Sequence, residues 1–111
     1  MGPGADNTFA VLDALRTELA AQSGNAPSAD LAAHVQAAGP IALGVLVREL
    51  CDDDDARSLR ASVLLMMLAE RHAARVIAAL EARLASAPAH RRGAVLGCLS
   101  ELNAISAAHR I

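Results

Sequence analysis

The stretch Cys51-Asp-Asp-Asp-Asp-Ala-Arg-Ser-Leu-Arg60 places four consecutive carboxylates between two apolar runs of the chain. Aspartate is a poor residue inside a helix, but it caps helix N-termini well and suits a first helical turn. A hard cation needs several oxygens that converge on one point, and an EF-hand loop also needs a glycine at its turn, which this run lacks. The run therefore predicts a capped turn between two helices rather than a metal site.

The composition around this turn is that of a small all-α domain. Hydrophobic residues make up 54 % of the 111 residues, and Phe9 is the only aromatic residue. Alanine and leucine, which are frequent throughout, are strong helix formers. The core is therefore expected to consist of aliphatic side chains and methionine on the faces of helices.

Before the aspartate run, apolar spacing and breakers predict three helices. The first has Phe9, Leu12, Leu15 and Leu19 in phase and ends at a breaker over 23–27. Ser28 starts a second, weaker helix. Gly39-Pro40 then separates it from an apolar helix over 41–50, since glycine fits just past a helix end and proline fits the first position of the next.

After the run, an apolar stripe of Leu59, Val63, Met66 and Met67 is widened by Leu64, Leu65 and Leu68. No glycine or proline follows before Ser86-Ala-Pro88, so one long helix over 56–86 is an alternative. We favour a break near 71–73, because long unbroken helices are uncommon in small domains. A last helix carries Val95, Cys98, Leu99 and Leu102.

Two segments of the chain share a pattern. Residues 60, 63, 64, 65 and 68 precede Arg91, Ala94, Val95, Leu96 and Leu99 by 31 positions. The preceding helices match at an offset of 34, where Leu43, Leu46 and Leu50 correspond to Ile77, Leu80 and Leu84. A period near 30–35 built from two helices is the signature of an α-solenoid.

Here the sequence resembles HEAT repeats, in which a Gly-Pro leads into one helix and an Asp-rich turn leads into an Arg-bearing second helix. In that family, an Asp and an Arg form a ladder between neighbouring repeats. The resemblance implies this role for one of the aspartates, Asp54 and Asp55 above all, with Arg57 or Arg60. The segment over 76–88 is also similar to the second helix of a tetratricopeptide repeat, although the aromatic positions of that family are missing.

These observations predict an all-α fold, a short right-handed α-solenoid of about five to six helices that is HEAT-like. Residues 1–28 are expected to form an N-terminal capping helix and linker, residues 29–103 the HEAT-like repeats, and residues 104–111 a C-terminal tail. Gly93 and Gly97 lie four residues apart in the last helix. They predict a close helix contact within the chain or, alternatively, a dimer face.

Charge is distributed unevenly along the chain. Residues 1–55 carry two arginines against nine carboxylates, a charge of −7, and residues 56–111 carry eight arginines against three, a charge of +5, which together give the net charge of −2. The two halves are expected to neutralise each other within one fold. The alternative is head-to-tail association or a charged partner.

The sequence contains few patterns that are typical of catalytic or metal-binding sites. No two histidines have the i, i+4 spacing of a helical zinc site, and no phosphate loop or nucleophile elbow is present. Cys51 and Cys98 form no disulfide framework. The chain begins without a secretory signal, and its longest uninterrupted apolar run, over 63–69, is far short of a membrane span. We expect a cytoplasmic protein that is not an enzyme and uses no cofactor or metal.

The function predicted is that of a protein-binding adaptor or scaffold of the α-solenoid type, self-associating and independent of membranes. Nucleic-acid binding is disfavoured, since there are no aromatic platforms for base stacking. The partner-binding residues predicted are the arginines of the basic half, Arg71, Arg75, Arg83, Arg91 and Arg92. Two alternatives remain: a small HEAT-like lyase-type enzyme acting on a cofactor, and an immunity-type inhibitor whose acidic half blocks a toxin.

Overall fold

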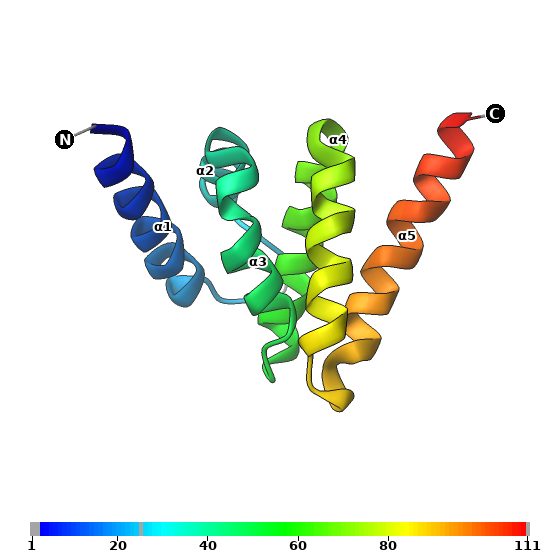
Figure 1. The fold of residues 1–111 in the computed structure, drawn as a ribbon. Helices are drawn as coiled ribbons and strands as arrows, with labels where there is room; N and C mark the ends of the chain where they lie inside the picture. Colours follow the sequence, from blue (N-terminus) through cyan, green and yellow to red (C-terminus); the bar gives the residue numbers. More distant parts are fainter. Residues whose placement is uncertain (1–2, 25, 111) are drawn as a thin grey trace.

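The prediction of an all-α fold is confirmed. The computed structural model describes residues 3–24 and 26–110, with side chains described over 9–24 and 26–104, and contains no strand in these ranges. Its elements, drawn in Figure 1, are α1 (Pro3–Ala21), α2 (Ala29–Ala38), the 3-10 turn η1 (Gly39–Ala42), α3 (Leu43–Leu50), α4 (Asp55–Ser86), the 3-10 turn η2 (Ala89–Arg91) and α5 (Arg92–Arg110).

Helix α4 is bent back on itself at His72. This residue has φ −130° and ψ 38°, far outside the helical region, within an otherwise continuous helical stretch. The predicted break near 71–73 is thereby confirmed, and α4 consists of a first half over 55–71 and a second half over 73–86. No glycine or proline produces this break, so it is not encoded by a local breaker.

The helices form a row in which successive segments alternate in direction (Figure 1). Helices α1 and α5 lie at the two ends of this row, and α2, α3 and the two halves of α4 lie between them. The molecule measures 43 × 31 × 28 Å along its principal axes. Helices α1, α3 and the second half of α4 run in one direction, and the segments between them return.

The predicted helix boundaries before α3 are confirmed. Ser28 caps α2 by accepting a hydrogen bond from the backbone N–H of Leu31 over 3.1 Å. Gly39 ends that helix with φ 64°, a left-handed conformation that glycine adopts at little cost. Pro40 lies in η1, where its fixed φ suits a first turn, so the α-helical part begins at Leu43 rather than at 41.

The core is aliphatic, as predicted, but two of the predicted apolar stripes include residues that are not buried. Leu15 and Leu19 are buried, whereas Phe9, expected to lie in phase with them, is 74 % exposed. In α4, the buried face is formed by Leu64, Leu65 and Leu68, while Leu59 and Val63 are 51 % and 43 % exposed. The reason is that neighbouring helices cover only one side of each of these helices.

The predicted close contact at Gly93 and Gly97 within the chain is wrong. A methyl group built on either glycine would meet no atom within 4 Å. Both glycines lie on the exposed side of α5, next to Leu96, which is 52 % exposed. The core-facing side of the helix is instead formed by Val95, Cys98, Leu99 and Leu102.

Candidate binding groove

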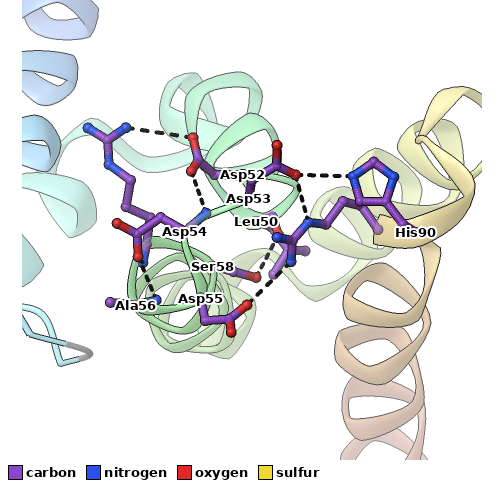
Figure 2. A network of polar contacts seen from close by, with 10 residues as sticks. Leu50, Asp52, Asp53, Asp54, Asp55, Ala56, Ser58 and His90 are labelled. Atoms are coloured by element: carbon purple, nitrogen blue, oxygen red, sulfur yellow. Dashed lines mark hydrogen bonds and ion pairs between the residues drawn. The ribbon is translucent and has the colours of Figure 1, made fainter.

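The aspartate run forms the turn between α3 and α4 (Figure 2). Asp54 is the N-cap of α4, since its Oδ1 accepts hydrogen bonds from the backbone N–H groups of Ala56 and Arg57 at 2.9 and 3.4 Å. Asp52 supports the cap by accepting a bond from the Asp54 N–H over 2.8 Å. The predicted capped turn is confirmed, and in the described part of the chain no group of three or more His, Cys, Asp or Glu side chains could hold a metal ion.

The same turn also binds the start of α5 (Figure 2). Asp53 Oδ1 lies 3.1 Å from His90 Nε2 and 3.3 Å from Arg91 Nε, and Arg91 Nη1 lies 3.5 Å from Asp55 Oδ1. The hydrogen bond from His90, then the hydrogen bond from Arg91 and the positive charges of both residues, lower the pKa of Asp53. These contacts join the acidic half of the chain to the basic half.

The four residues implied to form a ladder do not form one continuous set of ion pairs. Asp54 caps its own helix, and Asp55 pairs with Arg91. Arg57 pairs with Glu49 at 3.7 Å and Asp52 at 3.6 Å, both within its own hairpin. Arg60 is 2 % exposed and donates a hydrogen bond to the backbone carbonyl of Gly24, which ties α4 to the loop after α1.

A groove runs between α3 and the second half of α4. It encloses about 370 Å³ and is lined by Leu43, Gly44, Val47, Arg48, Ala79, Ala82, Arg83 and Ser86. The glycine and the two alanines keep its floor low, and a methyl group built on Gly44 would meet no atom within 4 Å. We call this feature the α3–α4 groove.

Two arginines flank the α3–α4 groove without a carboxylate partner. Neither Arg48 nor Arg83 forms an ion pair with any carboxylate in the described part of the chain. Arg48 is exposed, while Arg83 is half-buried and its Nε is buried without a hydrogen-bond partner. Because no carboxylate neutralises Arg83 in the described residues, its charge is left for an anionic group outside the chain.

A second hollow continues this surface across α1. It encloses about 140 Å³, shares Gly44 and Arg48 with the groove, and is otherwise lined by Leu12, Arg16, Ile41 and Val45. Arg16 forms no ion pair with a carboxylate among the residues described, and Ile41 is 45 % exposed. The surface of α1, α3 and the second half of α4 therefore combines arginines with apolar side chains.

The predicted partner-binding arginines are distributed over three places. Arg83 lines the groove, and Arg75 is exposed on the same half of α4, at a spacing from Ala79 and Ala82 that puts it on the same helix face. Arg71 lines a separate hollow of about 330 Å³ with Gln36 and Glu70. Arg91 is held by Asp53 and Asp55, and Arg92 donates from Nε to the carbonyl of Ala87 over 3.3 Å.

Sequence reasoning missed Arg16 and Arg48, because each looked like an ordinary polar residue on the edge of its helix. The offset of 34 contained a signal for Arg48. It aligns this residue with Ala82 on a neighbouring, parallel helix, next to Arg83. Residues aligned by a helical repeat lie side by side when the repeats stack.

Two further polar features, the His34–Glu18 contact and the Cys98 thiol, lie outside the α3–α4 groove. His34 Nδ1 lies 2.7 Å from Glu18 Oε1 at the rim of an apolar hollow of about 310 Å³ between α1 and α2. Burial raises the pKa of the Cys98 thiol, because the thiolate loses hydration inside the protein. The neutral thiol is a weak nucleophile, so Cys98 is suited to packing.

By length and composition, one stretch of the described chain, Ala29–Leu50, is long and apolar enough to cross a membrane. It is not one rod, however, since it includes α2, the turn at Gly39–Ala42 and α3, which run in opposite directions (Figure 1). Of its most apolar window, 39 % is buried inside the protein.

Comparison with known proteins finds no matching family model, no matching curated protein and no matching solved structure. The resemblance to HEAT repeats therefore stays a prediction from the sequence pattern.

Proposed function

We propose that this protein is a protein-binding adaptor or scaffold module, not an enzyme, which holds a segment of another protein in the α3–α4 groove. The observation that carries the proposal is the pair of arginines, Arg48 and Arg83, that flank a low apolar floor and lack carboxylate partners in the described residues. Protein interfaces usually have an apolar centre that is surrounded by a polar or charged rim. We place this function in the cytoplasm, where free thiols such as Cys51 and Cys98 persist.

The architecture we propose is a short right-handed α-solenoid of the HEAT-like type. Its support is that several positions matched by the two sequence offsets are buried alike. Leu64 and Val95, 31 residues apart, are both fully buried, and Leu46 and Leu80, 34 residues apart, are 1 % and 0 % exposed. The matched pair Leu65 and Leu96 differs, at 0 % and 52 % exposed, and Leu96 lies on α5 at the end of the row. Equivalent environments at equivalent positions are expected when hairpins stack in series.

An immunity-type inhibitor is a weaker proposal. It would need free carboxylates in the acidic half, but Asp52, Asp53 and Asp55 form ion pairs with arginines of the same chain. A cofactor-dependent lyase is also weaker, because neither the groove nor the neighbouring hollow on α1 has a carboxylate, histidine or cysteine in its lining to act as acid or base. Self-association is untested by any described contact and stays a prediction.

Photo-crosslinking in cells of the source organism tests the proposal. Ala82, which is exposed in the groove, is replaced by a photoreactive benzophenone amino acid, and Ala33, exposed on α2 outside the groove, serves as the matched control position. A single protein should attach through position 82 and not through position 33. It must then bind the purified chain. Equal attachment at the two positions, or none at position 82, would reject the groove as the binding site.

A further inference from the structure

Polar contacts of the folded chain use five of the eight carboxylates whose side chains are described in the acidic half. Glu18 pairs with His34, and Glu49 and Asp52 pair with Arg57. Asp53 and Asp55 pair with the start of α5. By contrast, the arginines along α1, α3 and the second half of α4 take part in none of these pairs. Folding therefore converts a chain that is acidic overall into a protein with one arginine-rich face.

We propose that the segment held in the α3–α4 groove is an acidic amphipathic helix of another protein. This inference rests on the proposed function and specifies its ligand. The apolar stripe of the helix lies on Gly44, Ala79 and Ala82, and carboxylates on its flanks pair with Arg48 and Arg83. A longer helix reaches Arg16 across the second hollow, which shares Gly44 and Arg48 with the groove.

A helix fits this surface better than an extended strand does. One common way for an extended peptide to bind is to add to the edge of a sheet, and the described residues offer no strand for it. The groove lies between two helices that run in the same direction, and its floor of glycine and alanine lets a third helix approach closely. A helix bound in a groove is recognised through its apolar residues at i, i+3, i+4 and i+7, and charged residues lie beside them.

Arg83 favours a carboxylate ligand in particular. Its side chain is half-buried and lines the groove, and its charge is paired with no carboxylate in the described residues. A carboxylate binds a guanidinium through two parallel hydrogen bonds, which are about twice as strong as neutral ones. A carboxylate of the ligand thus supplies the negative charge that the folded chain does not place beside Arg83.

Two other ligands fit the observations less well. A second copy of this chain would have to supply acidic residues from one surface, yet five of the eleven described carboxylates are already paired and Asp54 caps α4. The others are spread singly over four helices: Asp13, Asp30, Glu70, Glu81 and Glu101. Single-stranded nucleic acid is bound through aromatic side chains on which bases stack, and the lining of the groove has none.

The test uses the peptide that is crosslinked to position 82, identified by mass spectrometry and made synthetically. We expect an amphipathic sequence with at least two acidic residues. Replacing its Glu and Asp with Gln and Asn should weaken binding to the purified protein about tenfold or more, and Arg48→Gln and Arg83→Gln should each do the same. Arg71→Gln, which changes an exposed arginine outside the groove, is the matched control and should leave binding unchanged.

The outcomes separate the acidic helix from the adaptor function. A crosslinked peptide that lacks acidic residues, or whose affinity is insensitive to Arg48→Gln and Arg83→Gln, would overturn the acidic helix while the adaptor function stands. Crosslinks to this chain itself or to nucleic acid would overturn both. If Arg83→Gln lowers the melting temperature, Arg83→Lys is used in its place. Lysine keeps the charge but loses the two-bond geometry, so an intermediate loss of affinity is expected.

Discussion

Asp53 and Arg91 lie 38 residues apart in the sequence and meet in the folded protein, with Asp53 Oδ1 3.3 Å from Arg91 Nε. His90 adds a second contact to the same oxygen (Figure 2). The turn between α3 and α4 is therefore joined to the start of α5. Together with the contacts of Asp55 to Arg91 and of Arg57 to Glu49 and Asp52, this contact joins the negative first half of the chain to the positive second half, as one of the two charge interpretations predicted.

The pKa of Asp53 should rise when His90 is replaced. Its pKa is lowered mainly by the His90 hydrogen bond and next by that of Arg91. A carboxyl group whose pKa is lower in the folded state stabilises the fold above its unfolded pKa, and this contribution disappears as the pH falls through the folded pKa. NMR titration of the Asp53 carboxyl carbon should show a higher midpoint in His90→Ala than in the unmodified protein. An identical midpoint would contradict the contact.

Loss of the N-cap of α4 should destabilise the protein measurably. Asp54→Ala removes the acceptor for the N–H groups of Ala56 and Arg57 and should lower the free energy of unfolding by about 1 kcal/mol. Asp54→Asn retains a capping oxygen and should cost much less. Urea unfolding followed by circular dichroism measures both. An equal loss in the two variants would show that charge, not the cap, is responsible.

Burial should decide the effect of leucine substitutions. Leu64 is fully buried, so Leu64→Ala should cost about 2–5 kcal/mol through lost contacts and a cavity. Leu96 is 52 % exposed on α5, and Leu96→Ala should change stability by about 0.5 kcal/mol or less. Thermal unfolding at a low and a high protein concentration compares the two variants, because stabilisation by a second copy increases with concentration. A large cost at Leu96 would indicate that this side chain is covered by a second copy.

Alanine should stabilise α5 at its two glycines. Space is open at Gly93 and Gly97, so each substitution by alanine should raise the free energy of unfolding by about 0.4–1 kcal/mol, by restricting the unfolded chain. Sedimentation velocity on the same variants tests the predicted self-association. Loss of stability that accompanies loss of a dimer would mean that the glycines pack against another copy.

Arg60 should matter more than Arg57, although both precede the buried face of α4. Arg60→Ala removes a buried side chain and its partly buried hydrogen bond to the Gly24 carbonyl, and should cost about 1.5–3 kcal/mol. Arg57 makes longer ion pairs at the surface, and Arg57→Ala should cost about 1 kcal/mol or less. Hydrogen exchange should also become faster around Gly24 in Arg60→Ala alone. Equal protection there in both variants would contradict this assignment.

Sequence by itself determined the helical elements and most of their boundaries. The caps at Ser28 and Asp54 and the left-handed Gly39 were predictable, because each acts on the backbone within a few residues of its own position. The bend at His72 was predictable only from the rarity of long unbroken helices in small domains, because no glycine or proline marks it. Helix spacing identified the apolar stripes but not their width, and Phe9 and Leu59 are exposed because no helix covers that side.

Tertiary structure alone decided which charges meet and which remain free. The sequence placed Arg91 and Arg83 in one basic set, yet Arg91 is held by Asp53 and Asp55 while Arg83 faces the α3–α4 groove beside Arg48. The side chains that pair with Arg91 lie more than 30 residues before it in the sequence. Whether they meet it depends on how the hairpins pack. Local propensity carries no information about it, so the groove became visible only in the folded chain.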